Sequence, residues 1–360
     1  MRAATFDDPT AQRLQPISTG AEPGLVGPLL AEALHDPRWL GCDVALISGG
    51  KSNLTYRVQC DAGEVVLRRP PLGHVLPTAH DMRREHRVLQ ALDGTAVPVP
   101  RVLHLGGADG PLGVDFYVME RVLGHVCRNA LPAGYADRSA NRAAIGEALL
   151  DVLAGLHAVD PAAVGLEDFG RPAGFVERQL RRWSKQWEAS KSGELPALDG
   201  LRDELARTLP PQRAAAIVHG DYRLDNTVLH PTAPGRIVAV LDWEMSTLGD
   251  PLTDLGTLLA YWSEETDDEV LAAARVMAPV TAADGFPSRS ELIGRYAAST
   301  GFDVSDIGWY QAFAFFKLAV VCQGIAARAA GGAMLGSGFD DAQRLVAPLV
   351  AAGRRILGLG

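Results

Sequence analysis

Two short polar segments that each follow an apolar stretch constrain this chain more than any other feature. Residues 219–226 read His-Gly-Asp-Tyr-Arg-Leu-Asp-Asn, and Asp242 comes sixteen residues after Asn226. Asp221 can align a hydroxyl group and accept its proton, while Asn226 and Asp242 offer the oxygen ligands that Mg²⁺ prefers. A simple turn is the alternative for residues 219–226, because turn-forming residues are common there. Asp242 at the end of the next apolar strand makes a metal-dependent site the favoured interpretation.

The spacing of Asp221 and Asn226 also indicates a reaction class. Asp-x-x-x-x-Asn is typical of the catalytic loop of kinases, in which the Asp serves the acceptor and the Asn serves a metal ion. Gly220 stands where protein kinases have Arg. Phosphoryl transfer requires positioning and charge neutralisation more than covalent chemistry. We therefore predict phosphoryl transfer, with Asp221 as a catalytic residue and with Asn226 and Asp242 as metal ligands.

Arg223, two residues after Asp221, is a second catalytic candidate. Its guanidinium can hold a phosphate group or the substrate, because it offers several N–H donors in one plane. A salt bridge to Asp225 or Glu244 explains this arginine equally well. His219 is expected to pack beneath the loop rather than to act as a base.

The chain before these segments has the pattern of a small strand-rich lobe. Short alternating stretches there end at Gly, Asp or Pro, as antiparallel strands joined by tight turns do. One helix interrupts them, with Met82, Glu85, Leu89 and Leu92 on one stripe. The expected strands span residues 44–47, 54–58, 64–68, 101–105 and 115–120, and the expected helices of this part span 25–34 and 79–92.

From about residue 141 onwards the pattern is mostly helical, and the two polar segments follow short apolar strands at 215–219 and 237–241. A small antiparallel lobe before a larger helical lobe predicts an α+β fold of the bilobal protein-kinase-like kind, with nucleotide between the lobes. We expect an irregular leader over 1–24, an N-lobe over 25–122 and a C-lobe over 123–360. The expected C-lobe helices span 144–157, 175–190, 251–262, 288–299, 309–330 and 341–357.

A strand arginine and a helix glutamate form a second candidate site. In kinases a strand lysine reaches the α- and β-phosphates and is held by a helix glutamate. Arg68, two residues before the Pro70-Pro71 stop, is the preferred counterpart, and alternation puts it on the face opposite Arg69. Glu85, a carboxylate on an apolar helix stripe, is its expected partner. A surface arginine and a separate i, i+4 pair within the helix are the alternative.

A turn over residues 48–56 precedes this strand and contains Gly49, Gly50, Ser52 and Asn53. Glycines between two strands let backbone N–H groups approach phosphates. We predict that these four residues contribute to nucleotide binding. An ordinary hairpin turn explains the segment equally well by itself, because the pattern is neither GxGxxG nor a P-loop.

The segment over residues 249–255 begins only seven residues after Asp242. A protein kinase has a long activation segment and a peptide-docking platform at this point, and this chain has no room for one. A small-molecule acceptor is therefore expected. Asp250 could touch metal or substrate, whereas Asp254 is expected to brace the catalytic loop by accepting hydrogen bonds from its backbone amides.

The composition narrows the function classes further. A net charge of −9 disfavours nucleic-acid binding, and four scattered cysteines support neither a zinc site nor a disulfide framework. The N-terminus lacks the apolar core of a signal peptide, and no uncharged apolar run reaches the roughly 20 residues of a membrane span. We expect a cytoplasmic protein without a membrane partner, either a monomer or a homodimer.

Taken together, these segments resemble the aminoglycoside phosphotransferase superfamily of kinase-like small-molecule kinases. The resemblance covers about residues 40–340 and is greatest to the branch also found as the N-terminal domain of some large acyl-CoA dehydrogenase proteins. It implies that Met119, Glu120 and Val122 lie in the hinge that meets adenine, that ATP and Mg²⁺ are used, and that Asp221 is the catalytic Asp. The segments that carry it are residues 67–71, 116–120, 178–183, 219–226, 241–254 and 309–328.

The expected function is ATP-dependent transfer of the γ-phosphoryl group to a hydroxyl of a small molecule. The association with dehydrogenases points to a hydroxy acid or hydroxyacyl-CoA as acceptor, which is an inference from association rather than from site chemistry. The alternatives are an aminoglycoside or amino-alcohol kinase, and a nucleotide-binding regulator without transfer activity. The regulator remains an alternative because Arg68 stands where kinases have a lysine.

Overall fold

The computed structural model describes residues 19–47, 53–72, 81–191, 193–276, 278–330 and 339–359. The chain divides into two compact units: unit 1 comprises Met1–His125 and Val238–Glu244, and unit 2 comprises Val126–Ile237 and Met245–Gly360. The return of Val238–Glu244 to unit 1 differs from the expected boundaries, which assign everything after residue 122 to one lobe. This division places Asp242 in unit 1, whereas Asp221 belongs to unit 2.

The centre of unit 1 is an antiparallel sheet with the strand order β1-β2-β3-β5-β4. Each strand lies within two residues of an expected one, because alternating apolar residues and Gly or Pro stops mark its ends. The strands are β1 (Asp43–Leu46), β2 (Leu54–Cys60), β3 (Gly63–Arg69), β4 (Val102–Gly106) and β5 (Phe116–Glu120).

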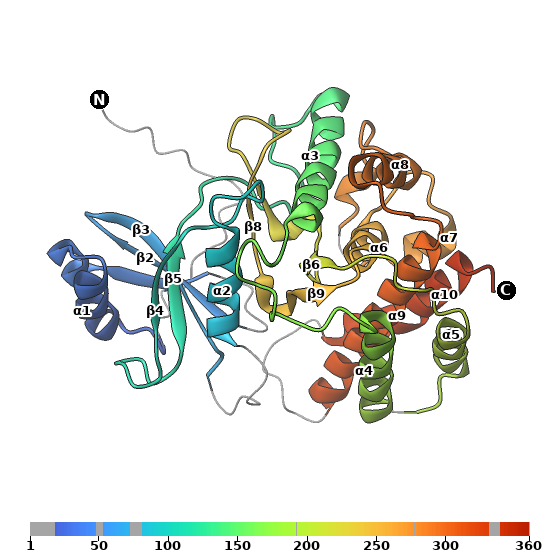
Figure 1. Cartoon of the computed structure of the whole chain (residues 1–360), viewed down its shortest axis with the longest axis horizontal. Helices are drawn as coiled ribbons and strands as arrows, with labels where there is room; N and C mark the ends of the chain where they lie inside the picture. Colours follow the sequence, from blue (N-terminus) through green and yellow to red (C-terminus); the bar gives the residue numbers. More distant parts are fainter. Residues whose placement is uncertain are drawn as a thin grey trace. The chain divides into compact units, whose positions relative to one another are not determined.

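Two helices cover opposite faces of this sheet, α1 (Pro23–Ala33) and α2 (Met82–Leu92) (Figure 1). Helix α1 and the short turn η1 (Pro37–Gly41) bury a core against one face, which includes Leu67 of β3. Because successive strand residues point to opposite faces, Arg68 lies on the α2 side, in register with Tyr117 of β5. The sheet therefore separates an apolar core from the face that carries the charged candidate residues.

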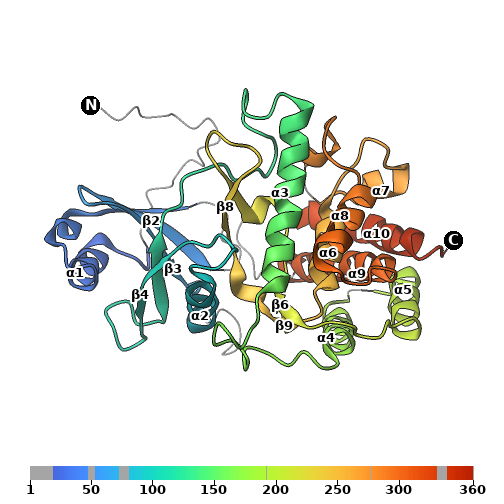
Figure 2. The same cartoon turned by 45° about the horizontal axis from the view of Figure 1, so that its top comes forward.

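Unit 2 is mainly helical and is built around α9 (Ile307–Ala330), which packs against α4, α5, α6 and α10. Figure 2 shows α9 and α10 side by side in the orange and red part of the chain. The helices besides α9 are α3 (Ser139–Ala158), α4 (Phe175–Ser190), α5 (Pro196–Arg207), α6 (Leu252–Tyr261), α7 (Glu269–Ala273), α8 (Arg289–Thr300) and α10 (Phe339–Ile356).

The helix expected over 175–190 is confirmed as α4. Two other helices of unit 2, α3 and α5, differ from the expected ones. Helix α3 begins at Ser139 rather than at Ala144, because its first turn is polar and carries no apolar periodicity. Helix α5 was not expected, although its sequence signals it through a proline in the first turn and buried leucines at helical spacing, Leu198, Leu201 and Leu205.

Two short strands of unit 2, β6 (Ala216–Val218) and β9 (Thr247–Gly249), pair antiparallel with Ile217 opposite Leu248. They fix the two ends of the region that contains the catalytic loop. The remaining short elements are η2 (Leu224–Asn226), β7 (Thr227–Leu229), β8 (Ile237–Val240), η3 (Trp243–Met245) and η4 (Val280–Ala282).

Helix α9 is long and apolar enough to cross a membrane by composition, with a mean hydropathy of 1.3 over Ile307–Arg328. The sequence has no uncharged apolar run of that length, because Lys317 lies in the middle of the helix. Sixty-seven per cent of the apolar window is buried inside the protein. Core helices of globular proteins share this pattern, and α9 has the contacts of a core helix in unit 2.

Candidate active site

Arg68 and Glu85 meet in unit 1, as the sequence predicts. The Nε atom of Arg68 lies 2.8 Å from Oε2 of Glu85, and the two side chains are 13% and 2% exposed. Strand β3 supplies the arginine and helix α2 supplies the glutamate. This burial excludes the alternative of a surface arginine beside an unrelated helix pair. Contact of Arg68 with phosphate stays a prediction.

Further carboxylates surround the same arginine. Its Nη2 atom lies 2.6 Å from Oδ1 of Asp242 and 3.8 Å from Oε2 of Glu244. Asn53, directly before β2, donates hydrogen bonds from its side-chain amide to Glu85 at 2.8 Å and to Glu244 at 3.2 Å. In the described part of unit 1, this cluster joins three carboxylates to one guanidinium.

The pKa values of the cluster follow from burial and from the charged neighbours of each group. Burial raises the pKa of Glu85 to about 7, Arg68 opposes the rise, and Asp242 and Glu244 add to it. The hydroxyl of Tyr117 donates to Glu85 at 2.9 Å and favours its charged form. Burial disfavours the charge on Arg68, but the surrounding carboxylates outweigh it and raise the arginine pKa. Carboxylate oxygens such as those of Asp242 are the ligands that a divalent cation would take, so the donor chemistry fits Mg²⁺.

Asp242 has an unusual backbone conformation, with φ of 67°. Aspartate tolerates this left-handed region better than most residues, because its short side chain can bond locally. The indole of Trp243 donates to the carbonyl of Val240 at 3.0 Å and fixes the same turn. The position of the Asp242 carboxylate after β8 is thus fixed by a hydrogen-bonded turn.

The catalytic loop of unit 2 is held by Asp254, which lies in the first turn of α6. Its carboxylate accepts hydrogen bonds from the backbone amides of His219 at 2.6 Å and Gly220 at 2.7 Å. This confirms the predicted bracing role. Gly220 has φ of 86°, and a Cβ there would lie 2.7 Å from the carbonyl oxygen of Met245, so the loop requires glycine at this position.

A buried polar chain supports Asp254 in turn. Nε2 of His157 lies 3.3 Å from Oδ2 of Asp254, and Nδ1 of His157 lies 2.6 Å from the hydroxyl of Tyr296. Burial alone would raise the pKa of Asp254, but the hydrogen bond and charge of His157 and the loop amides outweigh it and lower the pKa. His219 is fully buried, and its ring packs edge-on against Tyr222. The packing expected for His219 is therefore confirmed.

Asp221, Arg223 and Asn226 form one hydrogen-bonded group in this loop. Nδ2 of Asn226 donates to the carbonyl of Asp221 at 2.8 Å and to its Oδ2 at 3.1 Å. Nε of Arg223 donates to the same Oδ2 at 3.1 Å, and Nη1 of Arg223 lies 2.8 Å from Asp225. The Asn226 amide nitrogen is thereby engaged, so Oδ1 is the atom of this side chain that would bind a metal ion. The salt bridge of Arg223 to Asp225 is present together with its contact to Asp221.

Comparison with known proteins decides the family. A sequence profile of the phosphotransferase enzyme family (APH) matches residues 43–283. The chain belongs to this family. It is 36% identical over 311 residues to acyl-CoA dehydrogenase family member 11 of Gallus gallus, a match that covers 85% of this chain and 39% of that protein. The chain thus spans well under half the length of this relative. The predicted resemblance to the dehydrogenase-associated branch is confirmed.

Solved structures agree with this family. One similar crystal structure is that of a protein from Ralstonia eutropha JMP134 that has been assigned as an aminoglycoside phosphotransferase. Its TM-score is 0.74 at 35% sequence identity, and the match covers 88% of this chain and 92% of that chain. A thermostable mutant of aminoglycoside phosphotransferase APH(4)-Ia, in a ternary complex with AMP-PNP and hygromycin B, has a TM-score of 0.58 at 15% identity, covering 91% and 97%. The second likeness concerns the fold alone. The expected α+β kinase-like fold and the class of small-molecule phosphotransferase are confirmed.

Several predicted nucleotide-binding residues of this phosphotransferase stay predictions. Gly49, Gly50 and Ser52 lie outside the described residues. In the expected hinge, Met119 is nearly buried within β5, opposite Val66. Glu120 accepts a hydrogen bond from the amide of Arg101 at 3.1 Å, and Val122 follows the strand and is partly exposed.

Asp250 has a structural role at the start of α6. Its carboxylate accepts hydrogen bonds from the amide of Leu252 at 3.0 Å and from the hydroxyl of Tyr310 at 2.8 Å. The side chain is 2% exposed, and burial raises its pKa. These contacts explain Asp250 without a metal or substrate contact.

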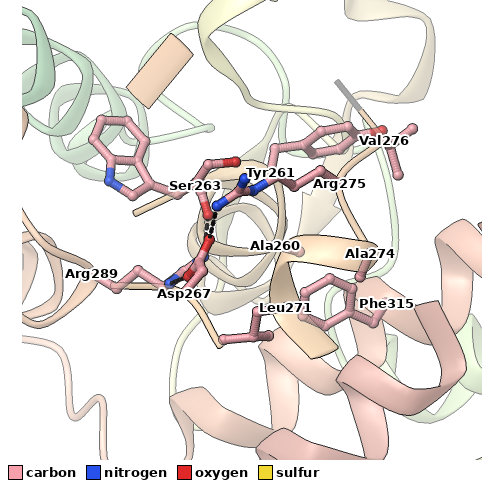
Figure 3. Close-up of a pocket in the computed structure, with 11 residues that line it drawn as sticks. Ala260, Tyr261, Ser263, Asp267, Leu271, Ala274, Arg275, Val276, Arg289 and Phe315 are labelled. Atoms are coloured by element: carbon pink, nitrogen blue, oxygen red, sulfur yellow. Dashed lines mark hydrogen bonds and ion pairs between the residues drawn. The ribbon is translucent and has the colours of Figure 1, made fainter. Parts of the chain in front are cut away.

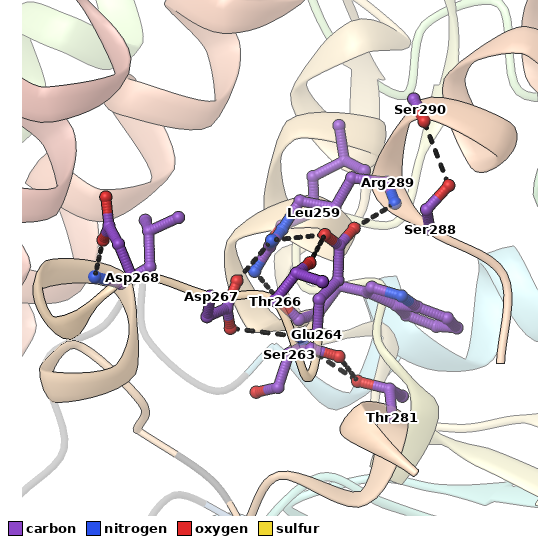
Figure 4. A network of polar contacts seen from close by, with 12 residues as sticks. Leu259, Ser263, Glu264, Thr266, Asp267, Asp268, Thr281, Ser288, Arg289 and Ser290 are labelled. Carbon is purple, nitrogen blue, oxygen red and sulfur yellow. Dashed lines mark hydrogen bonds and ion pairs between the residues drawn. The ribbon is translucent and has the colours of Figure 1, made fainter. Parts of the chain in front are cut away.

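Arg289, at the start of α8, holds the C-terminal end of α6, and the sequence analysis missed it. Its guanidinium donates to the carbonyls of Leu259 at 3.2 Å and of Trp262, and lies 2.7 Å from Asp267 (Figure 4). Carbonyls at a helix C-terminus lack partners inside the helix, so these donors stabilise that end. No local motif signals this role, because all the acceptors are distant in sequence.

Tyr261, the last residue of α6, connects this network to the catalytic loop. Its ring lies 4.7 Å from the Arg223 guanidinium, a cation–π distance. Tyr261 also lines a cavity of about 10 Å³ beside Asp267 and Phe315 (Figure 3). A space of that volume holds one water molecule at most. The cavity is therefore no acceptor pocket, and Tyr261 acts as a support for Arg223.

Proposed function

We propose that this phosphotransferase moves the γ-phosphoryl group of ATP to a hydroxyl group of a small molecule. The observation that carries the proposal is that the side chain of Asp221 is held in a defined orientation. Its carboxylate is oriented by Arg223 and Asn226, within a loop whose backbone is fixed by Asp254. A base that is held in place before substrate arrives is what positioning catalysis requires.

Each candidate residue has a role in this proposal. Asp221 aligns the acceptor hydroxyl and takes its proton, and Arg223 holds the orientation of Asp221. Asn226 and Asp242 hold Mg²⁺, which neutralises phosphate charge when bound. Arg68, held by Glu85, contacts the α- and β-phosphates in place of the usual lysine.

We further propose that adenine meets Met119, Glu120 and Val122, and that Gly49, Gly50, Ser52 and Asn53 cover the phosphates. The complex of the APH(4)-Ia relative with AMP-PNP supports nucleotide use by this fold. The side chain of Asn53 already donates to Glu85 and Glu244, so its contribution to the nucleotide site is to hold those carboxylates.

For the acceptor, we propose a hydroxy acid or a hydroxyacyl-CoA in the cytoplasm. The dehydrogenase-family relatives support this choice, since the similarity to them extends over most of the chain. An aminoglycoside or amino-alcohol acceptor is the second candidate, because the chain is 31% identical over 199 residues to viomycin phosphotransferase of Streptomyces vinaceus.

The decisive experiment compares Asp221→Ala and Asp221→Asn with the wild type. We expect both variants to lose phosphoryl transfer, on the order of 1000-fold or more in kcat, because a general base contributes about that much. Nucleotide binding, measured by calorimetry with ATP and Mg²⁺, should stay within a few-fold. Unchanged turnover in either variant would exclude the proposed role of Asp221.

A coupled assay over hydroxy acids, hydroxyacyl-CoAs, amino alcohols, sugars and aminoglycosides identifies the acceptor class. The regulator alternative predicts that ATP binds with Mg²⁺ while every acceptor fails and slow ATP hydrolysis is absent. Stimulation by aminoglycosides alone would favour the second candidate.

A further inference from the structure

Lys317 is a cation beside the catalytic loop that the proposed chemistry does not use. It projects from the middle of α9, and its Nζ atom donates to the carbonyl of Gly220 at 2.7 Å. That bond joins the lysine to the residue directly before Asp221. A lysine ammonium has three N–H donors, so two remain for another acceptor.

Neutralisation of this charge is incomplete. In the part of the chain that the structure describes, no carboxylate oxygen lies within 4.0 Å of the Lys317 Nζ atom. Burial lowers the lysine pKa, the charges of Asp221 and Asp254 oppose this effect, and those of Arg182 and Arg223 add to it. Partly buried ammonium groups are costly unless an anion accompanies them.

Lys317 and a second cation lie against the same aromatic ring. The Lys317 ammonium is 5.6 Å from the ring centroid of Trp183, and the Arg182 guanidinium is 5.7 Å from that ring. Arg182 is exposed and, among the described residues, pairs with no carboxylate. The other arginines of this helix face are engaged, since Arg178 donates to backbone carbonyls and Arg181 lies 3.4 Å from Glu177.

We propose that Lys317 and Arg182, which both lie against the Trp183 ring, bind an anionic group of the phosphoryl acceptor, a carboxylate or a phosphate. The acceptor would then be held at two points, with its hydroxyl at Asp221 and its anionic group at Lys317. Charge-assisted hydrogen bonds from both cations give this contact its strength. The inference rests on the proposed function for calling the ligand an acceptor, but the anion contact itself does not require turnover.

The arginines of this α4 face differ in their contacts. Arg178 and Arg181 hold neighbouring groups, whereas Arg182 pairs with no carboxylate among the described residues. Lys317 could not be found from the helix pattern, since it lies on α9, more than 130 residues further along the chain.

Tryptophan fluorescence provides a test that is independent of catalysis, because Trp183 lies against both cations. The probes are β-hydroxybutyrate, its neutral primary amide, and coenzyme A without an acyl group. In the wild type we expect the acid to bind about tenfold more tightly than the amide. Lys317→Met should remove this preference, and Lys317→Arg should restore most of it. Trp183→Phe identifies the part of the signal that comes from this site.

Lys185→Met is the matched control, since Lys185 is an exposed lysine on the same helix as Arg182. It should leave the preference unchanged. Binding of the free acid but not of coenzyme A assigns the anion as a carboxylate, and the reverse assigns it as a phosphate. Equal binding of acid and amide by the wild type, absence of binding by both anions, or equal weakening of acid and amide in Lys317→Met would overturn the proposal.

Turnover separates this inference from the proposed function. With an active acceptor, Lys317→Met should raise KM for the acid about tenfold and leave KM for the amide unchanged. A loss of kcat that is the same for both would assign Lys317 to bracing Gly220 and overturn the anion contact. If no acceptor is phosphorylated while the anion preference persists, the transfer function fails and the anion site stands.

Discussion

The two units hold their candidate side chains in opposite ways. In unit 1, Arg68 and its carboxylates contact each other directly through their charged ends. In unit 2, one buried carboxylate, Asp254, holds the backbone of the loop and leaves the side chain of Asp221 to be oriented separately. The first arrangement depends on the balance of charge, and the second depends on fixed backbone geometry.

This difference has a consequence for ligand binding. The amides of His219 and Gly220 are already bonded to Asp254, so the loop that carries Asp221 is fixed in advance. In unit 1, Asp242 is occupied by Arg68 at 2.6 Å. We expect cation and nucleotide to rearrange contacts in unit 1 and to leave the loop of unit 2 largely as it is.

Among the variants that compare the two units, Asp254→Ala should have the largest effect, and it tests whether one carboxylate governs the loop. Removing it leaves the amides of His219 and Gly220 and the ring of His157 without their acceptor. We expect a loss of about 3–5 kcal/mol in the free energy of unfolding and a fall of at least about 100-fold in kcat/KM. Urea denaturation and steady-state kinetics measure the two. Asp254→Asn keeps one acceptor and should be milder; equal stability of the alanine variant and the wild type would contradict the bracing role.

Arg68→Met should come next and tests the charge balance of unit 1. Loss of the guanidinium leaves the carboxylates of Glu85 and Asp242 unneutralised, and we expect kcat/KM for ATP to fall on the order of 100-fold. Arg68→Lys keeps the charge and should recover to within about tenfold of wild type. If methionine and lysine behave alike, the charge at this position does not govern nucleotide use.

Glu85→Gln tests the same cluster through its pH dependence. The pKa of Glu85 in the folded protein is raised to about 7 from 4.5, so the folded state holds this proton more tightly than the unfolded state. Stability from this group is present below pH 4.5 and is lost as pH rises through 7. Between these values the wild type should lose on the order of 2–3 kcal/mol more than Glu85→Gln. Denaturation curves at several pH values, without Mg²⁺, provide the comparison, and parallel pH profiles would refute it.

Tyr261→Leu should have the smallest effect. It tests whether side-chain contacts, as well as backbone hydrogen bonds, hold the catalytic loop of unit 2 in place. Loss of the ring under Arg223 removes a cation–π contact but none of the hydrogen bonds to Asp221. We expect kcat to fall about tenfold or less. Tyr261→Phe retains the ring and is the control, with activity near wild type. A loss as large as that of Asp254→Ala would show that side-chain support matters as much as backbone bracing.

The sequence predicted local features well. The strands of unit 1, helix α4, the Arg68–Glu85 pair and the bracing of the loop by Asp254 all follow from short-range patterns or spacing. The sequence did not indicate that Val238–Glu244 belongs with unit 1, or that Glu244 joins the cluster around Arg68. These contacts join residues more than 170 positions apart, and no periodicity records such a distance.

By itself the sequence determined the reaction class, because Asp221, Asn226 and Asp242 lie at spacings that phosphoryl transfer uses. It also determined which faces of strands and helices are apolar, since that depends on the backbone repeat. The tertiary structure alone decided how charge is distributed around those residues. Burial and neighbours from distant segments raise the pKa of Glu85 and leave Lys317 without a carboxylate within 4.0 Å among the described residues. Electrostatic energy depends on distance and burial in space, which the order of residues does not specify.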